Sequence, residues 1–351
     1  MKKTKKMIRN LILFILLIIL TFWLILKDQD VTQIFNILGT VKQEFILIAI
    51  MCMCIFLICD AINIGRGLKA LGEKSSFSKN IKYALIGFFF SSITPAATGG
   101  QPMQIYYMHK NKITVANATL TFLMNLTCVQ IVTISMALFS LIFNFQYMNR
   151  AMAWFFIIGI TLNSSALVLL LISIISKRMS KALIDVTLKI LKFFRVKNIE
   201  EKEEKFKKEL NRYYEGAKYI KANRKLMLKT LLTTYLQYIF YYSISYFVYC
   251  SFGLSQHNIF QMITTQSVLY ATVSGIPSPG AVGVSEGGFL ALYSAIYPDN
   301  VLSSAMLLCR GVNFYLFVII SSVVVCVNII RDKKEEKTED SIQNVIEENK
   351  K

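Results

Sequence analysis

Glu286 and Arg310 are the charged residues of this sequence that most need explaining, because each interrupts a long apolar stretch. Glu286 precedes Gly287, Gly288 and an apolar run, which predicts a carboxylate in the first turn of a helix. The helix dipole stabilises that carboxylate by about 0.3–1 kcal/mol, whereas a charge at membrane depth costs about 2.5–3.5 kcal/mol. Glu286 therefore needs a partner, and Arg310 is the only basic residue inside the last apolar segment, before residue 331.

An ion pair between Glu286 and Arg310 has two interpretations. In the first, the pair only joins two segments of the chain. In the second, it also presents spare guanidinium donors, which bind phosphate in a bidentate geometry. Both interpretations stay open here, and the second predicts contact with the phosphate of a lipid.

Glycine and proline concentrate in two stretches, residues 91–104 and 274–288, which hold four of the five prolines and seven of the sixteen glycines. Apolar runs flank both stretches. Because lipid cannot hydrogen-bond the backbone groups that a broken helix frees, such breaks indicate a site that is buried in protein or lines a wet cavity. Free N–H groups beside half-helix N-termini would attract anions there, and we expect them at Gly99, Gly100, Gly280 and Gly283. The other predicted substrate-binding residues of these stretches are Pro95, Gln101, Gln104, Pro277 and Pro279.

The apolar runs themselves define the fold class. The chain is 54% hydrophobic and 17% charged, whereas soluble chains carry about a quarter charged residues and membrane β-barrels show alternation. We predict an all-α polytopic membrane protein, with two broken segments at residues 83–108 and 262–297 that form re-entrant hairpins. The six predicted transmembrane helices cover residues 11–26, 45–64, 115–143, 152–175, 231–252 and 301–330. A cleavable signal peptide is the alternative for the first, but an A-x-A-like site is absent after it.

Basic residues set the predicted orientation. They cluster at residues 2–9, 66–82 and 177–229, after every second predicted crossing, which places these segments and both termini in the cytoplasm. The two hairpins would then enter from opposite sides, as in an inverted repeat with a binding site near the midplane. The net charge of +18 therefore reflects topology and attraction to anionic lipid headgroups, not nucleic acid. We expect a membrane domain over residues 1–330 and a disordered charged cytoplasmic tail over residues 331–351.

Other polar residues support alternatives that the sequence leaves open. Asp60 is either a functional carboxylate within the membrane or a partner of Arg66 at its edge. Tyrosines at spacings of three and four in residues 235–249 either pack or line a route for headgroups. The seven cysteines and two histidines show no ligand spacing, so we expect neither a metal nor another cofactor.

The two broken stretches carry a resemblance. Residues 94–104 (TPAATGGQPMQ) and 276–287 (IPSPGAVGVSEG) resemble the signature stretches of the flippase-like family that includes the transmembrane region of lysylphosphatidylglycerol synthase, or multiple peptide resistance factor. The second stretch is similar to that family's Pro-Gly-Gly-x-Gly-x-x-Glu pattern, with Ala281 at the second glycine. The first has Gln101 and Gln104 where many members carry Glu and Arg. The resemblance covers residues 11–330 and lacks the soluble aminoacyltransferase domain, which implies that a separate synthase would supply any aminoacylated lipid.

The resemblance implies translocation of lysylphosphatidylglycerol or a related phospholipid, and with it resistance to cationic antimicrobial peptides. The enzyme alternatives are a phosphatidylglycerol lysyltransferase and a polyprenyl-phosphate-sugar glycosyltransferase-like protein. A scaffold that recruits partners through residues 177–229 is the third alternative.

Overall fold

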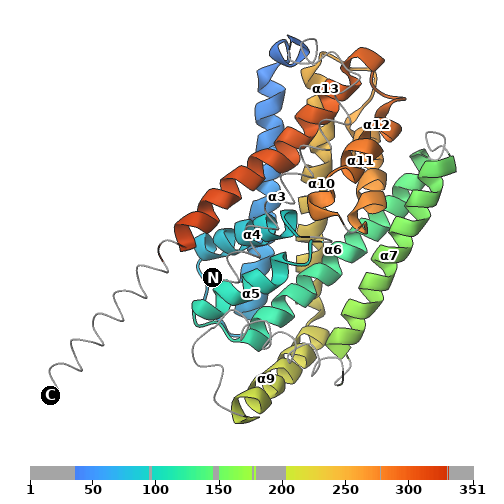
Figure 1. Ribbon diagram of the computed structural model, residues 1–351. Coiled ribbons are helices and arrows are strands. Elements are labelled where there is room, and N and C mark those ends of the chain that lie inside the picture. The colour runs from blue at the N-terminus through green and yellow to red at the C-terminus, as the bar shows by residue number, and fades with distance from the viewer. Residues whose placement is uncertain are drawn as a thin grey trace.

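The computed structural model describes residues 36–94, 97–144, 150–175, 178, 203–276, 278–329 and 331, and this part of the chain is helical without strands (Figure 1). The predicted first span, residues 11–26, lies outside the described residues. So do nearly all of the predicted tail and residues 179–202 of the basic segment.

Four helices of the described chain are long and apolar enough to cross a membrane. They are α3 (Gln43–Ala70), α6 (Val115–Asn144), α7 (Arg150–Ile175) and a continuous helix over Asp299–Ile329. The last of these comprises α13 (Asp299–Arg310), the π-helical turn η4 (Gly311–Tyr315) and residues 316–329. The all-α membrane fold is therefore confirmed.

Helix α10 (Arg224–Ser251) occupies the remaining predicted span, residues 231–252, and is 28 residues long, as α3 is. It is not among the four apolar helices, because tyrosine, threonine and serine make up much of its sequence. It runs antiparallel to α3. Lys42 N donates to Ser251 O at one end (2.9 Å), and Arg66 Nη1 donates to Lys229 O at the other (2.8 Å).

The two broken segments form helix hairpins. The first consists of α4 (Phe77–Ser92) and α5 (Gly100–Lys110). The second consists of α11 (Ile259–Ser274), the 3-10 turn η3 (Pro279–Ala281) and α12 (Val284–Tyr293). Helices α4 and α11 begin earlier than the sequence predicted, because the side chains of Ser76 and Asn258 cap their N-termini.

The hairpins enter the helical bundle from opposite ends. Helix α4 follows the end of α3, whereas α11 follows the end of α10. Because α3 and α10 are antiparallel, these two ends lie on opposite sides of the bundle. The hairpin tips meet in the interior, where η3 packs against α4 (Figure 1). The two breaks therefore lie close together within the bundle.

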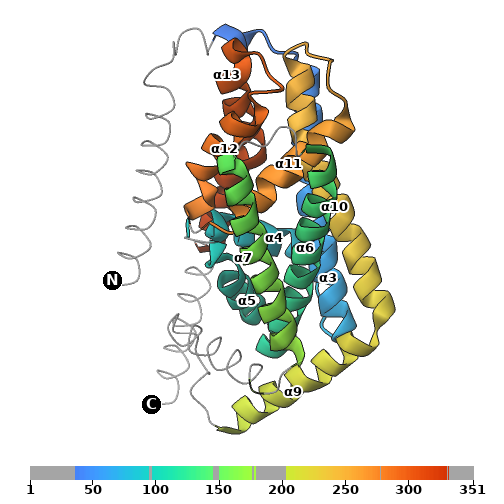
Figure 2. The same ribbon diagram turned by 90° about the vertical axis from the view of Figure 1, so that its right-hand side faces the viewer.

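Within the basic segment of residues 177–229, a packed helix, α9 (Glu203–Ala222), crosses one end of the bundle (Figure 2). Tyr213 is fully buried, and its hydroxyl donates to Ser173 O at 2.8 Å. A Cβ on Gly216 would meet Leu120 and Leu71, so α9 lies close to α6. The apolar face of α9 is therefore buried against the bundle, whereas Lys218 and Lys221 remain exposed.

Candidate functional site

The Glu286 carboxylate lies at the centre of the site and is only 1% exposed. It belongs to the first turn of α12, as predicted, and its Oε2 accepts from Gly283 N at 2.8 Å. Its Oε1 accepts from Arg310 Nε at 2.8 Å and from the Tyr315 hydroxyl at 3.0 Å. The expected ion pair with Arg310 is therefore present, and Tyr315 is a further partner that the sequence did not indicate.

Arg310 joins three elements at its position in the last turn of α13, where it is 7% exposed. In addition to the pair with Glu286, its Nη2 donates to Gly280 O in η3 at 3.2 Å. Its guanidinium carbon lies 4.3 Å from the centre of the Phe314 ring, within cation–π range. The arginine thus holds the tip of the second hairpin against the last helix.

A π-helical turn brings Arg310 and Tyr315 to the same carboxylate. Residues five apart in an α-helix point about 140° away from each other. In η4, Leu316 N donates to Gly311 O, five residues back, and this wider turn aligns the two side chains. The π-helical turn therefore allows both Arg310 and Tyr315 to hydrogen-bond to Glu286.

Glycine permits the close approach of the two hairpin tips. Gly280 has φ +59°, and a Cβ there would overlap the Phe314 ring and lie 3.1 Å from Ser92 O. A Cβ on Gly100 would overlap the Ser91 hydroxyl and lie 2.8 Å from Gly87 O. Any larger side chain at these two positions would separate the elements that enclose the site.

Two of the four backbone N–H groups expected to attract anions are engaged within the protein. Gly99 N donates to Thr94 Oγ1 at 2.9 Å, and Gly283 N donates to Glu286. The sequence could not reveal this, because both acceptors are side chains placed by the local turn.

Of the remaining predicted site residues, Gln104 and Asp60 have clear surroundings. Gln104 is buried and donates to Tyr83 O at 3.0 Å, so it joins α5 to α4. Asp60 is half-buried in α3 and makes no side-chain hydrogen bond or ion pair with the described residues. The pairing alternative for Asp60 is wrong, because Arg66 donates to Asn63 Oδ1 and Lys229 O instead.

The predicted residues Pro279 and Gln101 lie near the two tips: Pro279 begins η3, and Gln101 is half-buried in the first turn of α5. Pro95 and Pro277 lie outside the described residues.

A cavity of about 190 Å³ lies beside the point where the two hairpin tips meet. Arg310 and Phe314 line it, together with five serines and two tyrosines. Tyr241 and Tyr270 contribute from α10 and α11, although Tyr241 is not part of the tyrosine pattern that the sequence suggested. The arrangement can bind a small polar group beside a guanidinium.

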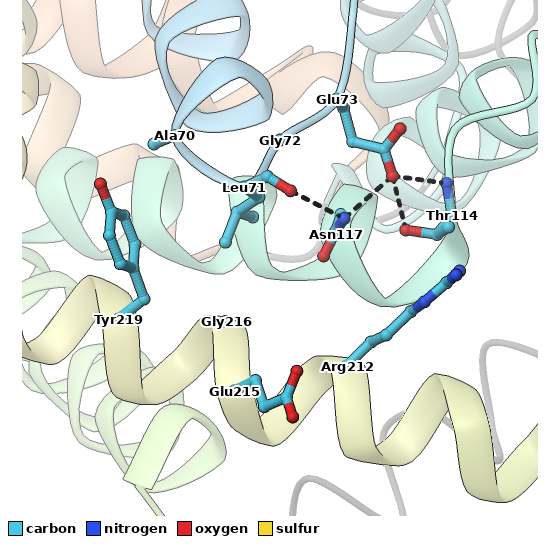
Figure 3. Close-up of a pocket in the computed structure, with 10 residues that line it drawn as sticks. All are labelled: Ala70, Leu71, Gly72, Glu73, Thr114, Asn117, Arg212, Glu215, Gly216 and Tyr219. Atoms are coloured by element: carbon cyan, nitrogen blue, oxygen red, sulfur yellow. Dashed lines mark hydrogen bonds between the residues drawn. The ribbon is translucent and has the colours of Figure 1, made fainter.

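A second hollow, of about 510 Å³, lies between the end of α3, the start of α6 and α9 (Figure 3). Glu73 Oε1 accepts from Thr114 N at 3.1 Å, Thr114 Oγ1 at 2.7 Å and Asn117 Nδ2 at 2.9 Å. These bonds satisfy donors at the N-terminus of α6. We therefore assign Glu73 to holding the α3–α4 connection against α6.

Fold and site together define a polytopic helical membrane protein with two opposed hairpins around a buried ion pair. The family described as "Lysylphosphatidylglycerol synthase TM region" matches residues 11–321, and the chain belongs to this family. Similar proteins include the UPF0104 membrane protein of Pyrococcus horikoshii, 24% identical over 92% of this chain and 97% of the relative. A UPF0104 membrane protein of Archaeoglobus fulgidus is 21% identical over 88% of this chain and 94% of the relative. The resemblance seen in the sequence is thereby confirmed.

Proposed function

We propose that this protein moves a phospholipid between the leaflets of the cell membrane, by binding its headgroup between the two hairpin tips. The single observation that supports this most is Arg310, a buried cation with hydrogen-bonding capacity beside a hydroxyl-lined cavity inside the bundle. The headgroup phosphate would bind Arg310, while the acyl chains remain in lipid. Opposed hairpins around one site suit alternating access from the two sides.

The family suggests the lipid to consider first. Lysylphosphatidylglycerol or a related phospholipid is the proposed substrate, and a separate aminoacyltransferase would supply the lysylated form. Its movement to the outer leaflet would make that leaflet more cationic and contribute to resistance against cationic antimicrobial peptides. We place both termini and α9 on the cytoplasmic side, where the exposed lysines of α9 meet anionic headgroups.

The test is translocation of fluorescent phospholipids in liposomes that contain the purified full-length protein. Wild-type protein should accelerate exchange between leaflets, and Arg310→Gln should remove most of that acceleration. Arg150→Gln is the matched control, because Arg150 is exposed at the start of α7. If folded wild-type protein accelerates no phosphatidylglycerol or lysylphosphatidylglycerol movement, the proposed function is wrong.

A further inference from the structure

The charge of the cavity lining differs from what a lysylated headgroup needs. Among the described residues that line the cavity, Arg310 is the only charged one, and none is a carboxylate. A lysyl headgroup carries ammonium groups, which are stabilised in a buried site by a carboxylate and are repelled by a guanidinium. The lining therefore suits an anion and does not suit a cation.

Glu286 cannot supply the missing negative charge. Both of its oxygens accept hydrogen bonds from within the protein, and the side chain is almost fully buried behind Arg310. Asp60, which lies within the apolar part of α3, does not line the cavity either. An ammonium group in the cavity would thus lose its water without gaining an ionic partner.

Arg310 and the hydroxyls offer donors to a phosphate. Arg310 uses Nε and Nη2 within the protein, and its guanidinium also lines the cavity. The Ser278 hydroxyl lines the cavity, is inaccessible to solvent and has no hydrogen-bond partner in the described structure. A buried hydroxyl without a partner is unfavourable, and a ligand oxygen would satisfy it.

The remaining lining hydroxyls match a headgroup with hydroxyls of its own. Ser91 and Ser92 belong to the first hairpin, Tyr270 and Ser285 to the second, and Tyr241 to the neighbouring helix α10. Serine and tyrosine hydroxyls both donate and accept, as the hydroxyls of glycerol or a sugar do. The cavity of 190 Å³ has the volume of about six water molecules, which is enough for a phosphate with a short polyol.

We infer that the cavity selects an anionic, hydroxyl-bearing phosphodiester headgroup, such as that of phosphatidylglycerol, and discriminates against its lysylated form. This inference rests on the proposed transport of a phospholipid, and of the substrates proposed above it favours a related anionic phospholipid over lysylphosphatidylglycerol at the same site. It assigns the phosphate to Arg310 and the polyol to the serine and tyrosine hydroxyls.

Binding and transport test the inference separately. Thermal stabilisation of the detergent-solubilised full-length protein would be measured with short-chain phosphatidylglycerol, its lysylated form, and glycerol phosphate. We expect phosphatidylglycerol to bind at least tenfold more tightly than the lysylated lipid, and more tightly than free glycerol phosphate. Equal or tighter binding of the lysylated lipid would overturn the selectivity. Tighter binding of free glycerol phosphate would show that the ligand is not a lipid.

Two variants that keep the ion pair locate the binding site. Ser278→Ala and Tyr241→Phe should each weaken phosphatidylglycerol binding several-fold without changing the melting temperature of the free protein by more than a few degrees. Ser294→Ala is the control, because Ser294 is exposed at the C-terminal end of α12 and does not line the cavity. Unchanged affinity in both cavity variants would contradict the assignment. Tight binding without translocation in liposomes would leave the inference standing and overturn the proposed transport.

Discussion

At the scale of single residues, the site depends on one buried carboxylate whose two oxygens both accept hydrogen bonds. Glu286 accepts hydrogen bonds from Gly283, Arg310 and Tyr315, which belong to two separate segments of the chain. A buried pair contributes little net stability compared with apolar residues, but removing one partner leaves a buried charge unpaired. We therefore expect both the stability of the protein and the proposed transport to be sensitive to Glu286.

Glu286→Gln should destabilise the protein by about 3–5 kcal/mol, because the Arg310 charge then lacks its counterion. Thermal unfolding in detergent would measure the loss. Adding Arg310→Gln to this variant should recover part of the stability, because the double variant contains no unpaired charge. Glu215→Gln, at an exposed position of α9, provides the control. If Glu286→Gln has the melting temperature of the wild type, the unpaired Arg310 charge does not destabilise the protein as we expect.

At the scale of elements, the hairpin tips depend on backbone that only small residues permit. Gly280 combines a left-handed conformation with contact to Phe314, and it presents the carbonyl that Arg310 binds. The neighbouring Ala281 also has a positive φ of 54°, where glycine would be less strained. The tip of the second hairpin is thus held in a strained conformation by its packing against α4 and η4.

Gly280→Ala should destabilise the protein by about 1–3 kcal/mol, because it adds left-handed strain and overlap with the Phe314 ring. We also expect slower lipid translocation, since Arg310 would lose its position against η3. Gly287→Ala is the matched control within the same stretch. A Cβ at Gly287 meets nothing within 4 Å, and alanine favours the α12 helix. Equal effects of the two substitutions would contradict this account of the tip.

At the scale of the whole molecule, α9 closes one end of the bundle with its apolar face inward and its charges outward. Lys218, Lys221 and Lys225 are exposed on α9 and at the start of α10. Exposed lysines near a membrane surface each gain about 1 kcal/mol from anionic lipid. This end of the molecule should therefore respond to the charge of the bilayer.

Replacing these three lysines by glutamine should reduce the stabilisation of the protein by anionic relative to zwitterionic nanodiscs. The difference should also shrink at high salt, because salt screens exposed charges. Melting temperatures in the two kinds of nanodisc would provide the measurement. Lys42→Gln, at the opposite end of α3, should leave the difference unchanged. If the triple variant retains the full lipid dependence, α9 does not act as a basic membrane contact.

The sequence by itself determined those features that depend on residues close together along the chain. Apolar runs defined the membrane helices, because about 20 residues must bury their backbone polar groups without water. Proline and glycine marked both breaks, and Glu286 could be placed in a first helical turn with Arg310 as its partner. The signature stretches also sufficed to identify the family.

Only the tertiary structure decided which distant groups meet. Tyr315 reaches Glu286 because of a π-helical turn, and Tyr241 reaches the cavity because of how α10 lies beside α11. Gln104 and Gly283 turn their donors to partners within the protein. Such choices depend on helix register and on packing between segments far apart in the chain, which the order of residues does not express.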